Sequence, residues 1–372
     1  MRFHRLKTAL AATLLSSIPA LAAAQVTPAA GFTPPDDTPS VRVGAVIFTD
    51  YTFIQAPKIP DNDGNSVHSS AFNVGRAYIN INGNISHVVA FRITPDITRE
   101  TGTGSSLNGS LVFRVKYAFL QANLDDWMWR GSWVRLGIQQ TPVVDFEEGI
   151  YRYRFQGTVF AEREGYLTSS DAGASFHTNL PQNYGEVHVG FYNGEGYSRL
   201  EANNEKAFQV RVTVRPLPRG AITRGLRVTG FWDADHYVKD GPKRRALVMT
   251  TFEHPNVNAG FDYLDATDKS TTNPTVVNAE LDGRGYSFWI TPRCSMGFEG
   301  LFRFDHLTPN RGGVGELERN RTIAGAAYWF PHQGTVSSAV LLDYEQVEAT
   351  LTAGSAASPT QKRIAVHGVI NF

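Results

Sequence analysis

The feature that most constrains this chain is an alternation of apolar and polar side chains with a period of two. It recurs in stretches of about ten residues between Val41 and Phe372. Such a period is typical of β-strands whose two faces meet different environments. In one stretch, Phe113, Val115, Tyr117 and Phe119 are predicted to share a face. Because no stretch keeps a helical period, the sequence predicts an all-β fold.

The connections between the predicted strands indicate which all-β fold is formed. About sixteen strands can be marked, and the gaps between them are alternately long and polar, as at 95–110, 141–168 and 234–245, or short turns. An even strand count with this alternation is typical of outer-membrane barrels, which have long loops outside and short turns in the periplasm. We therefore predict that residues 41–372 form a transmembrane antiparallel β-barrel of 16 strands with a polar, wet lumen.

The N-terminal residues have the composition of an export signal. Arg2, Arg5 and Lys7 precede a short apolar stretch and then small residues, which predicts a signal peptide over residues 1–24. Residues 25–40, rich in Pro, Thr and Ala, are expected to be a flexible lead-in. The predicted location is the outer membrane of a Gram-negative-type bacterium, with the lipid of that membrane around the barrel.

The last strand also carries a pattern of its own. Phe372, Ile370 and Val366 share one face and end the chain on an aromatic residue. Such an ending resembles the signal by which outer-membrane barrels are recognised for insertion. The barrel-assembly machinery is therefore an expected partner.

Several stretches resemble the phosphate-selective porin O and P family. They are FNVGRAYININGNI (Phe72–Ile85), VRLGIQQTPV (Val134–Val143), SSDAGASF (Ser169–Phe176), VGFYNGEG (Val189–Gly196) and AFQVRVTVRP (Ala207–Pro216). The resemblance implies a sixteen-stranded, usually trimeric porin whose third extracellular loop folds into the lumen and narrows it. By order along the chain, that constriction loop is residues 141–168.

Charged residues on the predicted lumen face are the candidate selectivity site, because the charges that line a pore select its ions. The first half of the barrel supplies cations and no acids to this face: Arg76, Arg92, Arg114, Lys116 and Arg135. The constriction loop adds both signs: Arg152, Arg154, Arg163, Asp145, Glu147, Glu148 and Glu164. We expect a cationic wall, partly neutralised by Glu147, Glu148 or Glu164. The alternative is that the arginines pair with the loop acids and hold the loop in place.

Composition removes other classes of function. The 35 basic and 35 acidic residues form no basic run, and the three basic residues of the leader leave the remainder slightly acidic, which argues against nucleic-acid binding. The single cysteine and the lack of an H-E-x-x-H or G-x-S-x-G motif give no indication of a metal site, a cofactor or an enzyme. A passive porin for small anionic or neutral solutes, with modest anion preference and phosphate among the candidate anions, is predicted. A closed structural or ligand-binding barrel, adhesive through its loops, is the alternative.

Overall fold

The computed structural model describes residues 37–201, 203–238, 241–269, 280–311, 316–351 and 359–372. The predicted signal peptide and residues 25–36 of the lead-in lie outside these ranges. Within the part described, no helix has both the length and the apolar character needed to cross a bilayer.

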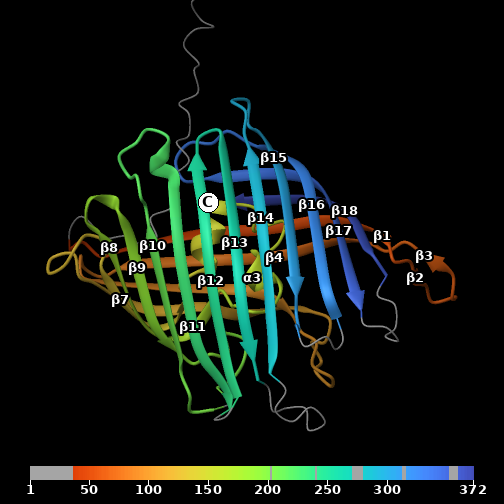
Figure 1. The fold of residues 1–372 in the computed structure, drawn as a ribbon, viewed down its shortest axis with the longest axis horizontal. Coiled ribbons are helices and arrows are strands. Elements are labelled where there is room, and N and C mark those ends of the chain that lie inside the picture. Colours follow the sequence, from red (N-terminus) through yellow and green to blue (C-terminus); the bar gives the residue numbers. More distant parts are fainter. Residues whose placement is uncertain (1–36, 202, 239–240, 270–279, 312–315, 352–358) are drawn as a thin grey trace, which may run out of the picture.

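Sixteen strands close into one antiparallel barrel, which confirms the predicted fold class (Figure 1). β1 pairs with β4 on one side and with the last strand, β18, on the other, so that the ring has no edge. The barrel strands are β1 (Ser40–Ala56), β4 (Ser70–Asn84), β5 (Val89–Arg99), β6 (Leu111–Asn123), β7 (Trp133–Gln140), β8 (Ser170–Leu180), β9 (Gly185–Tyr192), β10 (Ala207–Val214), β11 (Leu226–Val238), β12 (Gly241–His254), β13 (Val257–Asp268), β14 (Leu281–Pro292), β15 (Phe298–Thr308), β16 (Glu316–Trp329), β17 (Ser337–Leu351) and β18 (Gln361–Asn371).

Most connections at one end of the ring are longer than those at the other, although the connection between β10 and β11 is longer than the one between β11 and β12. The end with mostly short turns, which also carries η1 (Pro181–Asn183) and η2 (Thr223–Gly225), is called the turn side below. The first long connection carries a small hairpin of β2 (Ile59–Pro60) and β3 (Ser66–Val67). The long gap predicted at 234–245 is wrong, because β11 and β12 continue through nearly all of it. The gap predicted from residue 95 likewise starts only after the end of β5.

A β-bulge changes the face of β6 partway along the strand. Val115 and Tyr117 pair with consecutive residues of β5, so Lys116 is the extra residue. Phe113 is 63% exposed on the outside of the ring, whereas Tyr117 is 3% exposed and Phe119 7%. Tyr117 and Phe119 therefore do not share a face with Phe113 and Val115, and the prediction that all four do is wrong. A bulge leaves no trace in a simple alternation of side chains, so the sequence does not reveal it.

The apolar residues of the last strand share one face, as predicted, and this face points outward. Val366, Ile370 and Phe372 are all exposed on the outer face, while His367 between them is buried. The backbone of Phe372 also bonds β1, because its N–H donates to the Ala45 oxygen over 3.1 Å and its carbonyl accepts from Ala45 N–H over 3.0 Å. The chain end thus completes the closure of the barrel.

Candidate functional site

The third long connection folds into the barrel, where it divides the lumen. It comprises residues 141–169, named L3 here, and contains α2 (Val144–Tyr151) and α3 (Phe160–Arg163). The base of L3 is tied together, since Thr141 N–H donates to the Ser169 oxygen over 3.1 Å and Thr141 Oγ1 donates to the Thr168 oxygen over 2.5 Å. In Figure 1, α3 lies behind the near strands β12 to β14, within the ring. L3 is thus the inward-folded loop that the resemblance implied.

One side of L3 packs on an apolar part of the barrel wall. Val144 and Phe160 of L3 are fully or almost fully buried, as are Leu247, Met249 and Leu341 on the facing strands, and all belong to one cluster. Burial of such side chains stabilises the loop by removing apolar surface from water. This part of the wall is apolar because L3 packs on it, so the expectation of a polar lumen is wrong here.

The same wall donates hydrogen bonds to the backbone of L3. Irregular backbone leaves carbonyl oxygens without partners, and buried ones need donors from elsewhere. Arg211 Nε donates to the Pro142 oxygen over 2.6 Å, Asn258 Nδ2 to the Ile150 oxygen over 2.8 Å, and Arg303 Nη1 to the Thr158 oxygen over 2.8 Å. Arg245 Nε adds a fourth bond, to the Tyr166 oxygen, over 3.1 Å. These four side chains fix the course of L3 from end to end.

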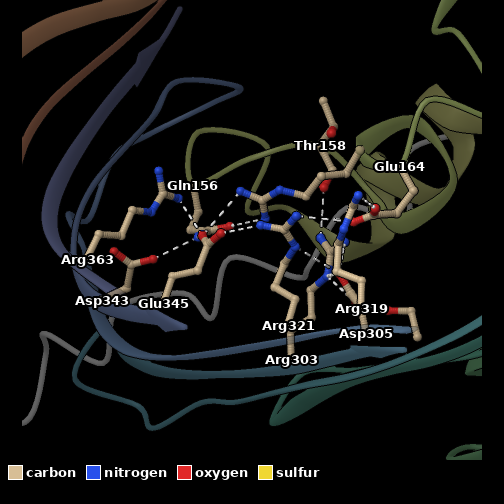
Figure 2. Close-up of polar contacts among 12 residues, drawn as sticks. Gln156, Thr158, Glu164, Arg303, Asp305, Arg319, Arg321, Asp343, Glu345 and Arg363 are labelled. Carbon is tan, nitrogen blue, oxygen red and sulfur yellow. Dashed lines mark hydrogen bonds and ion pairs between the residues drawn. The ribbon is translucent and has the colours of Figure 1, made fainter. Parts of the chain in front are cut away.

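Carboxylates and arginines shared between L3 and β15–β18 form a second set of anchors, shown in Figure 2. Glu345 accepts bonds from Arg163 of L3 at 3.3 Å, from Arg363 at 2.5 Å and from Arg321. Glu164 of L3 pairs with Arg319 at 2.6 Å and with Arg321 at 3.1 Å. Gln156 of L3 also donates to Asp343 at 2.8 Å and to Glu345 at 2.9 Å. We call this group, together with Arg303 and Asp305, the anchor cluster.

The anchor cluster corrects part of the predicted selectivity site. Glu164 turns toward β16 and does not approach the predicted cationic wall. Glu147 is 2% exposed and interacts electrostatically with Asp262 of β13, also away from that wall. Arg163 is held by Glu345, and Arg152 lies 3.6 Å from Glu299 of β15. Arg152, Arg163 and Glu164 hold the loop because the wall beneath it carries opposite charges, which spacing along the chain does not reveal.

The predicted cationic wall on β4–β7 is present but is not free of acids. Asp96 is completely buried between Arg76, at 3.5 Å, and Arg114, at 3.4 Å. The prediction missed Asp96 because it placed the end of β5 in a loop. Continuing the alternation from Arg92 through Thr94 would have put Asp96 on the lumen face.

The other three cations of this wall contact neutral groups. Arg92 Nη2 donates to Asn80 over 2.8 Å, Lys116 Nζ to the Tyr78 hydroxyl over 3.3 Å, and Arg135 Nε to Gln121 over 2.7 Å. With the described residues, none of the three forms an ion pair within 4.0 Å. The alternative that these cations pair with the acids of L3 is therefore wrong for Arg92, Lys116 and Arg135, and the ion pairs that anchor the loop lie on the opposite wall.

Two acids of L3 face the cationic wall. Asp145 accepts a hydrogen bond from the Tyr117 hydroxyl over 2.8 Å. Glu148 lies 2.6 Å from Arg154 and, with Asp145, acts electrostatically on Lys116. Cations on one side and carboxylates on the other set up a transverse field across the passage between L3 and β4–β7.

A cavity lies at either side of this passage. The turn-side cavity has a volume of about 1020 Å³ and is bounded by Arg92, Arg135, Asp145 and residues of four short turns. The second cavity, of about 530 Å³, lies toward the long connections and is bounded by Asp50, Arg76, Arg154 and Arg363. L3 contributes residues to both cavities, so it is the partition between them.

A closed ring of sixteen strands with its third loop folded inside defines the porin type of β-barrel. No known family profile matches the sequence, and no curated protein matches it. Among solved structures, OmpT, an outer membrane protein of Vibrio cholerae, is similar at 13% identity over 90% of this chain and 100% of its own, with TM-scores of 0.62 for a loop L8 deletion mutant and 0.59 for the trimer form. An anion-selective porin from Comamonas acidovorans is similar at 10% identity, covering 90% of this chain and 100% of its own, with a TM-score of 0.60. At these identities the likeness concerns the fold.

Proposed function

We propose that the protein is an outer-membrane porin that lets small hydrophilic solutes diffuse passively, with a modest preference for anions. The observation that carries the proposal is the arrangement of Arg92, Lys116 and Arg135, which face L3 while L3 itself is anchored to the opposite wall. Cations that are not consumed in anchoring the loop enrich anions in a narrow passage with walls of low dielectric constant. Asp145 and Glu148 lower this preference. We therefore propose a channel that is not specific for phosphate, with phosphate as one permeant anion among several.

We also propose where the protein is located and how it is assembled. The exposed apolar outer face suits a lipid bilayer, and the signal peptide proposed for residues 1–24 would direct export. A homotrimer and assembly by the barrel-insertion machinery are proposed as well. The similarity to OmpT in a trimer form supports the first of these.

One observation favours the alternative of a barrel without conductance. The bond from Tyr117 to Asp145 joins L3 to β6, so that the loop is bound to both walls of the lumen at that level. A barrel closed in this way would serve as a structural or ligand-binding protein.

Recording in planar lipid bilayers distinguishes the two proposals. A porin gives stepwise conductance increments, and in a salt gradient its reversal potential has the sign of anion preference. A purified, heat-modifiable barrel that inserts and gives no steps would support the alternative. Steps with a cation-selective reversal potential would contradict the anion preference alone.

A further inference from the structure

The turn-side cavity contains more cations than its own acids can neutralise. Seven arginines bound it, against three carboxylates. Arg211 pairs with Glu186 at 2.9 Å and Arg227 with Glu253 at 2.7 Å. Asp145, the third acid, accepts the bond from Tyr117.

The five remaining arginines have no carboxylate partner among the described residues within 4.0 Å: Arg92, Arg130, Arg135, Arg215 and Arg224. The cavity on the other side of L3 differs. Its three arginines, Arg76, Arg154 and Arg363, are all ion-paired. The excess of positive charge is therefore confined to the turn side.

Buried polar nitrogens without partners belong to side chains that line the same cavity. Arg227 is 1% exposed, and its Nε and Nη1 have no partner in the described protein. Trp133 Nε1 and His188 Nε2 are in the same condition, and both side chains are at least nine-tenths buried. Buried polar groups of a native protein are nearly always satisfied, so the wall of this cavity has hydrogen-bonding capacity that the described protein groups do not use.

An aromatic ring holds one of the unpaired guanidinium groups in place. Arg135 lies 3.8 Å from the ring centre of Trp133 and donates from Nε to Gln121 and from Nη1 to Gln140. The stacked guanidinium is fixed in direction and keeps its charge and its Nη2 donor for a carboxylate or a phosphate. A pre-positioned guanidinium loses little entropy when it binds.

We propose that the turn-side cavity is a binding site for a small anion that carries several carboxylate or phosphate charges. The proposal rests on the porin function above, since the anion reaches the cavity from the lumen or from the turn-side solution. Several charges are favoured because five arginines without a carboxylate partner border the cavity, although Arg130 and Arg224 are exposed to solvent. The volume of about 1020 Å³ accommodates such a solute together with water.

Calorimetric titration of the full-length, detergent-solubilised barrel tests binding without any need for conductance. Inorganic phosphate and citrate are the two probes, and chloride is the monovalent reference. We expect saturable binding of phosphate, citrate or both, which weakens as the salt concentration rises. Binding of one probe alone identifies phosphate or carboxylate as the preferred group. Failure of both probes to bind above chloride overturns the site, while the porin proposal is judged separately by conductance.

Two variants separate a built site from general attraction by positive charge. Arg215→Gln with Arg224→Gln removes two unpaired cations at the rim, and Arg227→Gln with Glu253→Gln removes the unpartnered donors without changing the net charge. We expect each to weaken binding about tenfold, since a bond to a charged group is involved. The matched control is Arg99→Gln with Arg199→Gln, which removes two exposed arginines outside this cavity. Equal losses in the rim variant and this control would contradict the proposed site. The rim variant alone decides if the buried pair variant does not fold.

Sidedness supplies an independent test in bilayers. Cys294 is the single cysteine of the chain, is exposed, and lies in the turn between β14 and β15. Its modification by an impermeant thiol reagent reports which chamber the turn side faces. Citrate or phosphate added to that chamber should reduce the current at lower concentration than from the opposite chamber. Equal potency from the two sides would overturn the placement of the site.

Discussion

Arg211 on β10 donates from Nε to the Pro142 carbonyl oxygen over 2.6 Å, and so binds the barrel wall to the start of L3. Its Nη1 also pairs with Glu186 at 2.9 Å. One buried guanidinium thus neutralises an acid of the wall and satisfies the loop backbone. Because L3 divides the lumen, the contact links the stability of the strands to the shape of the passage.

Arg211→Gln is therefore expected to lower the free energy of unfolding by about 2–3 kcal/mol, because it removes one of the two partners of the buried Glu186 and leaves only His177, at 3.0 Å. Urea unfolding of the barrel in detergent measures the change. Arg219→Gln, at an exposed position of the next turn, is the control and should change this free energy little. Similar values for the two variants would show that the Arg211 contacts contribute nothing to stability.

The ion preference is expected to depend on the two wall cations that face the acids of L3. Arg92→Gln together with Lys116→Gln should shift the reversal potential toward cations and leave the amount of folded barrel unchanged, since both bond only neutral partners. Arg114 is a poor choice for this test because it is paired with Asp96. Arg99→Gln with Arg199→Gln again controls for net charge. A reversal potential that does not move would place selectivity elsewhere.

Alternation and connection lengths were sufficient to predict the closed sixteen-stranded barrel and the shared face of Val366, Ile370 and Phe372. Both depend on local periodicity, which a single strand displays by itself. The bulge at Lys116 could not be predicted, because one extra residue leaves the composition of both faces unchanged.

The contacts of the site could not be predicted as well as the strands, because they do not depend on local periodicity. Glu148 and Glu164 have similar neighbours in the sequence, yet one faces Lys116 and the other Arg319. Which wall a loop residue meets is decided by the path of L3 across the lumen. That path depends on contacts over long sequence separations, such as Arg303 with Thr158.

The anchor cluster is expected to restrict the motion of L3. Glu345→Gln removes the charge on which Arg163, Arg321 and Arg363 converge, and should lower the free energy of unfolding by about 3 kcal/mol. Current recordings should show greater noise, and protease should cleave L3 faster. Glu348→Gln, exposed on the same strand, is the control. Unchanged current noise together with unchanged proteolysis of L3 would mean that the apolar contacts of L3 are enough to hold the loop in place.

A pH-dependent contact is expected at the turn between β4 and β5. His87 Nδ1 lies 2.5 Å from Asp37 and its Nε2 lies 2.8 Å from Asp126. The hydrogen bond to Asp37, followed by that to Asp126, raises the pKa of His87 above 6.5, and the bonds to His87 lower the pKa of Asp37. A raised histidine pKa gives stabilisation that is complete below 6.5 and is lost as pH rises through the folded-state value.

Hydrogen exchange near Asp37 and His87 should therefore quicken as pH rises past this value, beyond the intrinsic increase of exchange with pH. His87→Gln should abolish the additional dependence. If the wild type and the variant follow the same pH profile, the contact does not hold Asp37 in place.

The terminal residue supplies the last prediction. Phe372 is 60% exposed, and its bonds to β1 come from its backbone, so Phe372→Ser preserves them. Loss of the ring removes apolar contact worth at most about 1–3 kcal/mol, too little to unfold a large barrel. If the barrel-assembly machinery recognises the ring, the variant should be scarce in the outer membrane and degraded in the periplasm. Phe298→Ser is the matched control, since Phe298 is 54% exposed on β15. Quantitative blotting of the two fractions compares them. Equal depletion of both variants would indicate a general need for outward aromatic residues, and normal amounts of Phe372→Ser would show that the terminal ring is not read.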